Sequence, residues 1–550
     1  MISTLALVAG TAATAFGADR ARRRLILSQA KHPSLAGHVR WGKRIAGQIP
    51  ATRYDEAEAF RIDGTPDEIA AAREAGFRRL AALFAERYPK SRALTAETKP
   101  GLSDLQFTGS YRVPFQFAQM VATALSAGSF YERSDGPVLT DLDGNRLWDL
   151  TGSYGVNVLG NEAYKRLMRA AVDEAEPLGA VLGGLHRNVA DNVARLKALS
   201  GLDEVSFHMS GTEAVMQAVR LARYHTGRSH LVRFCGAYHG WWGDVQPGIG
   251  NPVPADGTYT LADMSEKSLR VLASKKNIAC VLVNPLQALH PNKGAPSDGA
   301  LVAGRIVTGA DREAYAAWLK RLADVCRANG IVLILDDVFT GFRLAPGGAA
   351  EYYGVQPDLV TYGKTLGGGF PVGVLCGRAS LMRRFREDRP VDICFARGTF
   401  NAHPYVMAAM NGFLRTLDEP ATRALYDGQH ARWDDRAAAL NARLAEQGLL
   451  VRVAHLGSIW TVLHEAPSRY NWMLQYYLRA EGLALSWVGT GRLIFSLDYD
   501  DAAFGEVADR FVAAAERMQA DGWWWCPEGA TSKTIGRTLL KEAILRRLGR

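Results

Sequence analysis

Cysteine is scarce in this sequence and shows no regular spacing. Six cysteines occur among 550 residues, and no two of them form a CxxC pair. Disulfide-rich secreted domains and structural zinc sites both need closely spaced cysteines, so neither class is expected. Cys280 and Cys326 lie in apolar runs, which predicts buried free thiols in a reducing compartment and no bound metal.

A secretory signal and a long apolar run are also lacking. Residues 2–17 are apolar and small, but no basic region precedes them and they are short for a membrane span of about 20 residues. A cluster of arginines follows at residues 20–24. Two interpretations stay open: a helix packed against the body of the protein, or a weak membrane anchor followed by cytosolic positive charge. We expect a cytoplasmic protein, with membrane association through this segment as the alternative.

Signatures of nucleic-acid binding are absent, although the formal net charge is +9. The excess is concentrated at the two ends of the chain, and neither a base-stacking motif nor a zinc finger is present. Residues 531–550 alternate apolar and basic positions, as an amphipathic basic helix does. We therefore predict a solvated basic surface and no nucleic-acid partner, while contact of the termini with a membrane stays open.

What the sequence does contain divides it into five predicted segments. They are a helical N-terminal extension (1–100), the N-terminal part of a small domain (101–160), a large α/β domain (161–410), a C-terminal small α+β domain (411–530) and a basic amphipathic tail (531–550). Within the second segment, residues 136–149 predict two short strands joined by an Asp-Gly-Asn turn.

The large domain alternates short apolar runs with helical segments. Five short runs predict strands: 205–208, 231–234, 278–283, 331–335 and 359–362. Several of them are apolar throughout, as expected of strands buried on both faces of a parallel sheet. The spacing leaves room for crossover helices. The predicted fold class is therefore α/β, with a mainly parallel sheet in a large domain and a smaller α+β domain.

Open parallel sheets bind ligands beyond the carboxyl ends of their strands. Two of the predicted strands lead into residues suited to a ligand that has a phosphate group and a flat ring. Ser210, Gly211 and Thr212 begin a helix after the first strand, where N–H groups, hydroxyls and the helix dipole suit a phosphate. Ordinary helix capping by Ser210 or Thr212 explains them equally. Tyr238 follows the second strand between glycines, where it can stack on a flat ring or simply pack in a loop.

Two ionisable residues follow later strands. Asp336 comes after five apolar residues, so its burial requires a partner such as a protonated pyridine nitrogen; an N-cap or a metal ligand is the alternative. Lys364 stands just ahead of three consecutive glycines. A lysine becomes a nucleophile at neutral pH when burial or neighbouring positive charge lowers its pKa, and the apolar surroundings favour burial over an ordinary surface position.

The order and spacing of these residues resemble the class III PLP-dependent aminotransferases, most closely the branch that includes glutamate-1-semialdehyde aminomutase. The resemblance extends over about residues 105–515. It is carried by IVLILDDVFTGFR (331–343) and GVQPDLVTYGKTLGGGFPVG (354–373), with Ser-Gly-Thr-Glu-Ala (210–214), Tyr-His-Gly (238–240) and Gly-Thr-Phe (398–400) around them.

The resemblance implies pyridoxal 5'-phosphate (PLP) as the cofactor and the aminotransferase fold. It implies that Lys364 forms the Schiff base and then carries the proton, and that Asp336 pairs with the pyridine nitrogen. Val338 and Tyr238 would pack on the two faces of the ring, and His239 joins the cofactor-binding set.

The phosphate is assigned, on the same resemblance, to Ser210, Gly211 and Thr212. Thr399 would reach the phosphate of the neighbouring subunit's cofactor, which implies a homodimer. Tyr154 falls where the family lines its substrate pocket.

The sequence departs from the family pattern near the expected cofactor. Asp337 and Asn284 stand where the family usually has glutamate, with Gln287 as a compensating polar residue of the substrate pocket, and residues 296–311 form an insertion. Four arginines are candidates for binding a substrate carboxylate: Arg112, Arg343, Arg397 and Arg492.

The terminal extensions look foreign to a compact aminomutase. We therefore predict a transaminase that moves an amino group between a small amino donor and a ketone or aldehyde acceptor, with intramolecular amino transfer as the alternative.

Overall fold

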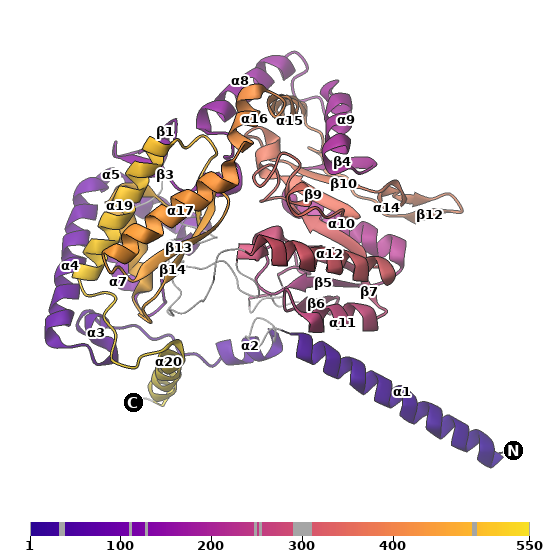
Figure 1. The fold of residues 1–550 in the computed structure, drawn as a ribbon, viewed down its shortest axis with the longest axis horizontal. Helices are drawn as coiled ribbons and strands as arrows, with labels where there is room; N and C mark the ends of the chain where they lie inside the picture. The colour runs from indigo at the N-terminus through magenta and orange to yellow at the C-terminus, as the bar shows by residue number, and fades with distance from the viewer. Residues whose placement is uncertain are drawn as a thin grey trace. The chain divides into compact units, whose positions relative to one another are not determined.

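The computed structural model describes residues 2–31, 39–108, 113–126, 130–246, 250–251, 256–289, 311–486 and 492–548. These residues fall into two compact units (Figure 1). The first comprises Met1–Gly47, Ala170–Gly294 and Asp311–Leu414, and the second includes Gln48–Arg169 and Arg415–Arg550. The predicted N-terminal extension is thus divided between the units, while the five-segment scheme itself stays a prediction.

The first unit is built on a sheet in which the described residues form seven strands, in the order β4-β10-β9-β8-β7-β5-β6. The strands are β4 (Glu204–His208), β5 (His230–Phe234), β6 (Thr258–Leu261), β7 (Ile278–Val283), β8 (Val332–Asp336), β9 (Leu359–Gly363) and β10 (Gly373–Gly377). Strands β6, β5, β7, β8 and β9 pair in parallel, and β10 is antiparallel to both β4 and β9. The predicted α/β fold with a mainly parallel sheet is confirmed, including its five predicted strands.

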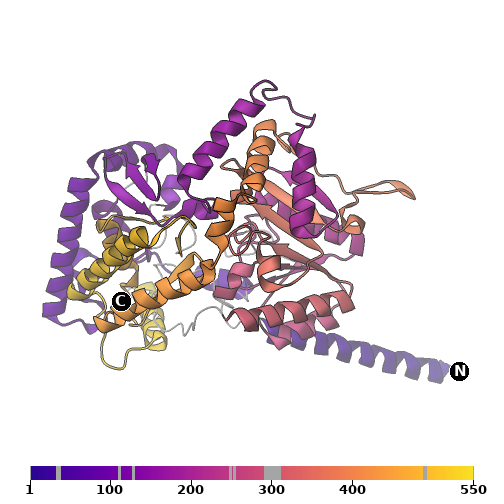
Figure 2. The same cartoon turned by 45° about the horizontal axis from the view of Figure 1, so that its top comes forward.

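Helices cover both faces of this sheet (Figures 1 and 2). Helix α10 (Gly211–Thr226) shares a buried apolar cluster with Leu231 of β5. Phe234, three positions further along β5, points to the opposite face and meets Trp318 of α12 (Arg312–Ala328), with ring centroids 5.2 Å apart. Further described elements of this unit include α1 (Ile2–Ala30), α2 (Val39–Ala46), α9 (Asn188–Ser200), α11 (Glu266–Ser274), α13 (Ala349–Tyr353), α14 (Ala379–Met382), α15 (Pro404–Thr416) and the hairpin β11 (Phe385–Arg386) and β12 (Arg389–Ile393).

The second unit contains two small sheets, β1-β2-β3-β15 and β13-β14-β16. Strands β2 (Val138–Asp141) and β3 (Arg146–Asp149) form the predicted antiparallel hairpin. The remaining strands are β1 (Tyr131–Asp135), β13 (Val451–Leu456), β14 (Ile459–His464), β15 (Leu483–Ala484) and β16 (Arg492–Ile494).

The helices of the second unit include α3 (Glu56–Arg61), α4 (Asp67–Arg87), α5 (Pro89–Thr98), α6 (Ser103–Thr108), α7 (Ala118–Ala124), α16 (Pro420–Tyr426), α17 (Gln429–Glu446), α18 (Leu474–Ala480), α19 (Asp501–Ala520) and α20 (Ser532–Arg547), and α8 (Asn161–Ala175) runs across the boundary between the units. The core of this unit is rich in aromatic residues, among them the fully buried Trp433, Trp460, Trp472 and Trp523.

The two ends of the chain differ in how they pack. Helix α1 (Ile2–Ala30) leaves Phe16 69% exposed, so burial against the body is wrong for Ala15–Gly17; the earlier side chains lie outside the described residues. The far end of α1 does pack, because the Ala30 carbonyl accepts the Ala262 N–H at 2.9 Å. At the other terminus, α20 packs on its unit through the buried Ile535, as the packed interpretation predicted.

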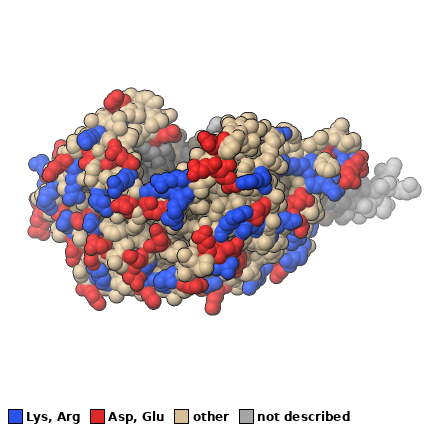
Figure 3. All heavy atoms as spheres, turned by 90° about the horizontal axis from the view of Figure 1, so that it is seen from above, with Lys and Arg blue, Asp and Glu red and all other residues tan. Residues whose placement is uncertain are grey.

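The described helices and the surface drawn in Figure 3 bear on the predicted membrane contact and on the predicted basic surface. Among the described residues, no helix is both long enough and apolar enough to cross a membrane. Basic and acidic side chains are interspersed on the face drawn in Figure 3. Cys280 and Cys326 are buried free thiols, as expected.

Candidate active site

Most predicted site residues of the first unit lie at the carboxyl ends of its strands. Asp336 is the last residue of β8 and is 4% exposed. Its Oδ2 lies 2.7 Å from His239 Nδ1, and its Oδ1 accepts the Val338 N–H at 3.3 Å. The hydroxyl of Thr361 on β9 lies 3.4 Å from the same Oδ1.

His239 is fully buried, and burial lowers its pKa although Asp336 opposes the shift. The lowered pKa favours the neutral imidazole, and the tautomer with the proton on Nδ1 is the one that would donate to the carboxylate. Its Nε2 has no partner among the described residues. The arrangement fixes the orientation of the Asp336 carboxyl group.

Lys364 directly follows β9 and has a left-handed backbone, with φ of 48°. A non-glycine residue in this conformation is strained, and such strain is typical of functional turns. Burial lowers the pKa of Lys364, and Arg343 lowers it further while Asp336 raises it. The Nζ atom lies 5.4 Å from the centre of the Phe339 ring. This amine is closer to its neutral, nucleophilic form than a surface lysine.

The predicted phosphate turn begins α10. Ser210 is the N-cap, and its Oγ accepts the Glu213 N–H at 3.3 Å, so helix capping accounts for this hydroxyl. The first N–H groups of a helix have no partners within the helix. A Cβ on Gly211 would lie 2.6 Å from Val338 Cγ1, so only glycine lets these two turns meet.

The loop that carries Tyr238 is hydrogen-bonded to residues that follow β7. Asn284 follows this strand, donates its side-chain amide to the Tyr238 carbonyl at 2.8 Å and accepts the Leu286 N–H at 3.1 Å. The Tyr238 side chain is 59% exposed. Gln287 is buried and donates its amide to the Cys235 carbonyl, so it supports the same loop. Its predicted place in the substrate pocket stays a prediction.

Asp337 is buried behind Asp336. Its carboxylate accepts the Thr340 hydroxyl and the Ala349 N–H, the latter at 2.7 Å. Burial raises its pKa to about 7. A Cβ on Gly348, whose φ is 80°, would lie 2.1 Å from Asp337 Oδ2. The backbone at Gly348 thus lies against the Asp337 carboxylate, and this close approach matches an aspartate at position 337, which is shorter than the usual glutamate.

Two predicted residues, Thr399 and Tyr154, are not brought to this cluster by contacts within the first unit. Thr399 is exposed in a turn of the first unit, and Tyr154 belongs to the second unit, where its φ is 56°. Of the candidate arginines, Arg343 acts electrostatically on Lys364, Arg492 lies in the second unit and Arg112 is outside the described residues. The roles of Thr399 and Tyr154 stay predictions.

Comparison with known proteins fits this geometry. Residues 121–514 match the family model described as aminotransferase class III. The chain belongs to this family. A glutamate-1-semialdehyde 2,1-aminomutase of Desulfotalea psychrophila (strain LSv54 / DSM 12343) is 33% identical over 367 residues, which cover 62% of this chain and 78% of that protein.

Two solved structures extend the comparison to transaminases. A β-phenylalanine aminotransferase from Variovorax paradoxus is 26% identical, with a TM-score of 0.61, over 82% of this chain and 98% of that one. A transaminase with PLP bound is 25% identical, with a TM-score of 0.59, over 72% of this chain and 92% of that one.

PLP is the cofactor of this family member. The described residues fit it: the buried Asp336 carboxyl, hydrogen-bonded to His239, suits a pyridinium, and a lysine with lowered pKa suits the aldehyde. The close approach at Gly211 brings the start of α10 to the same strand ends as Val338. The sequence motifs did not predict the contact of the Thr361 hydroxyl with Asp336. They also did not predict the hydrogen bond from Asn284 to the Tyr238 carbonyl.

Proposed function

We propose that this chain moves an amino group between two carbons of a single small substrate, the reaction type named for its glutamate-1-semialdehyde aminomutase relative. The 33% identity over the catalytic region carries this choice. The sequence alone favoured transfer between two substrates, because the terminal extensions looked foreign to an aminomutase. The relative favours the intramolecular alternative.

The residues of the first unit divide the chemistry between them. PLP, when bound, supplies a ring that withdraws electrons from the substrate carbon carrying the amino group. Lys364, with its lowered pKa, would be the base that moves a proton between the amino-bearing carbon of the substrate and the C4' atom of the cofactor. Asp336 keeps the ring nitrogen protonated, and His239 keeps Asp336 oriented.

The remaining proposed contacts position the cofactor. Gly211 and Thr212, with the weaker candidate Ser210, offer the start of α10 to the phosphate. Val338 and Tyr238 flank the ring. Tyr154 and Gln287 are proposed for the substrate pocket on the resemblance alone.

Transfer between two substrates is the second candidate. It is favoured by the β-phenylalanine aminotransferase, which this chain matches over 98% of that protein's length. Asn284 and Asp337, which differ from the usual family residues, also leave room for a different substrate.

Turnover with one substrate separates the two reactions. The PLP-loaded enzyme is given glutamate 1-semialdehyde alone, and product with the amino group moved from carbon 2 to carbon 1 is counted per active site. We expect many turnovers, and none from Lys364→Ala. A reaction that stops after about one turnover, and resumes only when an amino donor or keto acid is added, would establish the transaminase instead.

We further propose a homodimer in which Thr399 reaches the neighbouring subunit's cofactor. Four exposed apolar side chains precede this residue in sequence: Phe385, Val391, Ile393 and Phe395. Mixing inactive Lys364→Ala chains with inactive Thr399→Tyr chains should restore part of the activity, because one hybrid site is then intact. Sedimentation as a monomer at micromolar concentration would contradict the dimer.

A further inference from the structure

Helix α20 presents a row of exposed apolar side chains on the surface of the second unit. Leu540, Ile544 and Leu548 are 61%, 50% and 67% exposed. They are four positions apart, so they lie along a single face of the helix. Scattered exposed apolar residues are ordinary, whereas a contiguous row of large ones marks a contact surface. We call these three residues the α20 stripe.

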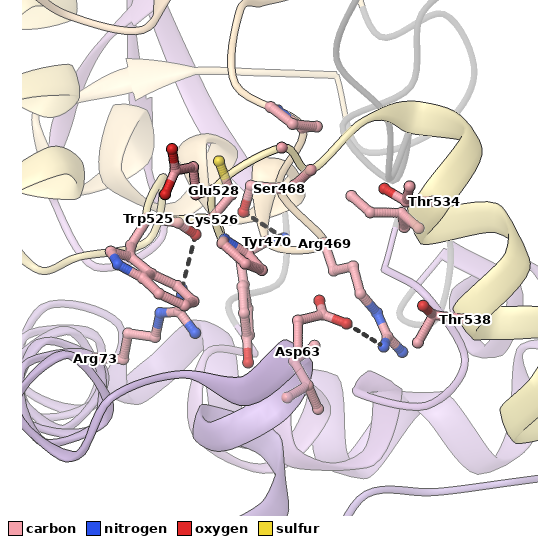
Figure 4. A pocket seen from close by; sticks show the side chains of 16 residues that line it. Asp63, Arg73, Ser468, Arg469, Tyr470, Trp525, Cys526, Glu528, Thr534 and Thr538 are labelled. Atoms are coloured by element: carbon pink, nitrogen blue, oxygen red, sulfur yellow. Dashed lines mark hydrogen bonds and ion pairs between the residues drawn. The ribbon is translucent and has the colours of Figure 1, made fainter.

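The opposite face of α20 packs on the second unit. Ile535 is buried, and Glu542 pairs with the buried Arg469 at 2.7 Å. Thr538 lines a pocket of the same unit together with Asp63 and Arg469 (Figure 4). The α20 stripe remains largely exposed after this packing, so the fold of the unit does not account for its apolar character.

The charged side chains that share the exposed surface of α20 are all basic. They are Lys533, Arg537, Lys541 and Arg547. Among the described residues, no carboxylate forms an ion pair with the first three. The one acidic residue of the helix, Glu542, pairs with Arg469 on the packed face instead. The exposed face of α20 thus combines large apolar side chains with net positive charge.

A further apolar residue lies near the C-terminal end of the stripe. Arg547 donates to the Gln48 carbonyl at 3.1 Å, which holds the end of α20 against the first residues of the second unit. Ile49, the next residue, is 51% exposed. The apolar surface therefore continues from α20 onto the N-terminal extension.

This mixture of side chains fits the surface of an anionic lipid bilayer. Apolar side chains enter the boundary between headgroups and acyl chains, while long basic side chains reach the anionic headgroups. The core of a protein–protein interface is depleted in lysine, whereas Lys541 adjoins Leu540 of the stripe. A nucleic acid would use the positive charges and leave the apolar row in water. A lipid surface uses both.

We propose that α20 docks on an anionic lipid surface, with the α20 stripe at the boundary between headgroups and acyl chains. Lys533, Arg537 and Lys541 then lie against the headgroups. A helix bound in this way lies in the plane of the surface and does not cross the bilayer. The contact is separate from the cofactor chemistry of the first unit, and it does not depend on which amino-transfer reaction the enzyme performs.

Flotation of the full-length, PLP-loaded enzyme with lipid vesicles tests the proposal. The vesicles consist of phosphatidylcholine alone, or of phosphatidylcholine with about 30% phosphatidylserine, which supplies the anionic surface. We expect binding to the anionic vesicles to be at least about tenfold tighter than to the neutral ones, and to weaken as salt is raised.

A first pair of variants tests the basic side chains. Arg537→Gln with Lys541→Gln should weaken binding to the anionic vesicles about 25-fold, because each basic residue near such a surface contributes about fivefold. Arg78→Gln with Lys90→Gln removes the same charge from exposed positions of α4 and α5. This control should bind nearly as tightly as the unmodified chain.

A second pair tests the apolar side chains at constant charge. Leu540→Ser with Ile544→Ser should weaken binding at least about tenfold, because apolar area entering the bilayer is lost. Leu102→Ser with Leu450→Ser, at scattered exposed positions of the same unit, is the control and should bind like the unmodified chain. The PLP absorbance should stay unchanged in all four variants.

Three outcomes would overturn the proposal. The first is equal binding to anionic and neutral vesicles, and the second is binding by the α20 variants that matches their controls. The third is a loss of oligomers in Leu540→Ser with Ile544→Ser while vesicle binding is unchanged, which would identify the α20 stripe as a contact between protein chains.

Discussion

Asn284 joins the end of β7 to the loop that carries Tyr238. Its amide donates to the Tyr238 carbonyl at 2.8 Å, while its oxygen accepts from Leu286. A glutamate, which the family usually has here, could accept hydrogen bonds but could not donate this one when ionised. The amide therefore fits the observed loop better than a carboxylate does.

Asn284→Asp keeps the acceptor for Leu286 and removes the donor to Tyr238. We expect the PLP dissociation constant to rise about tenfold, because one hydrogen bond in the loop is lost and a charge meets a carbonyl. Absorbance titration with PLP measures it. Asn277→Asp, at the opposite end of the same strand, is the matched control and should leave PLP affinity unchanged. Equal effects of the two variants would refute a local role for Asn284.

The buried His208 should cause part of the loss of stability of the first unit at acidic pH. It ends β4, and burial, with a contribution from Arg384, lowers its pKa to about 4 from the ordinary 6.5. Between these values the unfolded chain binds a proton that the folded chain does not, so stability falls as pH falls below 6.5. This residue should cost about 2 kcal/mol of unfolding free energy between pH 7 and pH 5.

Urea unfolding at the two pH values tests the His208 effect. His208→Gln should lose less stability on acidification than the unmodified chain, by about 2 kcal/mol. His225→Gln, at the end of α10, is the control and should behave like the unmodified chain. An unchanged pH difference in His208→Gln would show that His208 is not the responsible group.

The sequence could predict single reactive residues but not their partners. Asp336 and Lys364 were recognisable because Asp336 ends one apolar strand and Lys364 directly follows another, which places both at one edge of a parallel sheet. His239 is 97 positions from Asp336, and nothing in its local pattern specifies that pairing. The use of Gln287 to hold a backbone carbonyl was missed for the same reason.

At the scale of elements, the site depends on the close contact between the turn at the start of α10 and the turn that follows β8. Gly211 begins α10 and Val338 follows β8, and a methyl group on Gly211 would overlap Val338. The helix start can therefore approach the strand ends only while position 211 is glycine.

Gly211→Ala should separate these turns and raise the PLP dissociation constant about tenfold or more. Gly211→Ala with Val338→Ala removes the overlapping methyl groups and should recover most of the affinity, which tests steric overlap directly. PLP titration of the two single variants and the double variant gives the coupling. Additive losses would mean that the two residues do not act through contact.

Strands with a strong apolar run were predictable, and two weaker strands were not. Strand β6 is short and lies at the edge of the sheet, with most of its side chains partly exposed. Strand β10 begins and ends with glycine, which weakens the strand signal, yet it is buried and antiparallel to both neighbours. Its position follows from pairing across the sheet, which local sequence does not encode.

At the scale of the whole molecule, the two terminal extensions join within the second unit. Tyr54 donates its hydroxyl to Glu542 at 2.8 Å across 488 positions of sequence, and Glu542 also pairs with the buried Arg469. Such contacts could not be predicted from helical periodicity, although the helices themselves could. They explain why α20 packs on its unit.

Glu542→Ala should destabilise the second unit by about 2 kcal/mol, because a buried guanidinium loses its main carboxylate partner. Tryptophan fluorescence during urea unfolding reports on this unit through its four fully buried tryptophans. Glu516→Ala, at an exposed position of α19, is the control and should change stability little. A Glu542→Ala variant as stable as this control would refute the role of the ion pair.

The central claim is that PLP is attached to Lys364. Reduction of the PLP-loaded enzyme with borohydride, followed by peptide mass spectrometry, tests it most directly. The account predicts a phosphopyridoxyl group on the peptide containing Lys364 and loss of that label in Lys364→Ala. Labelling of a different lysine, or no labelling of a protein that retains PLP, would contradict it.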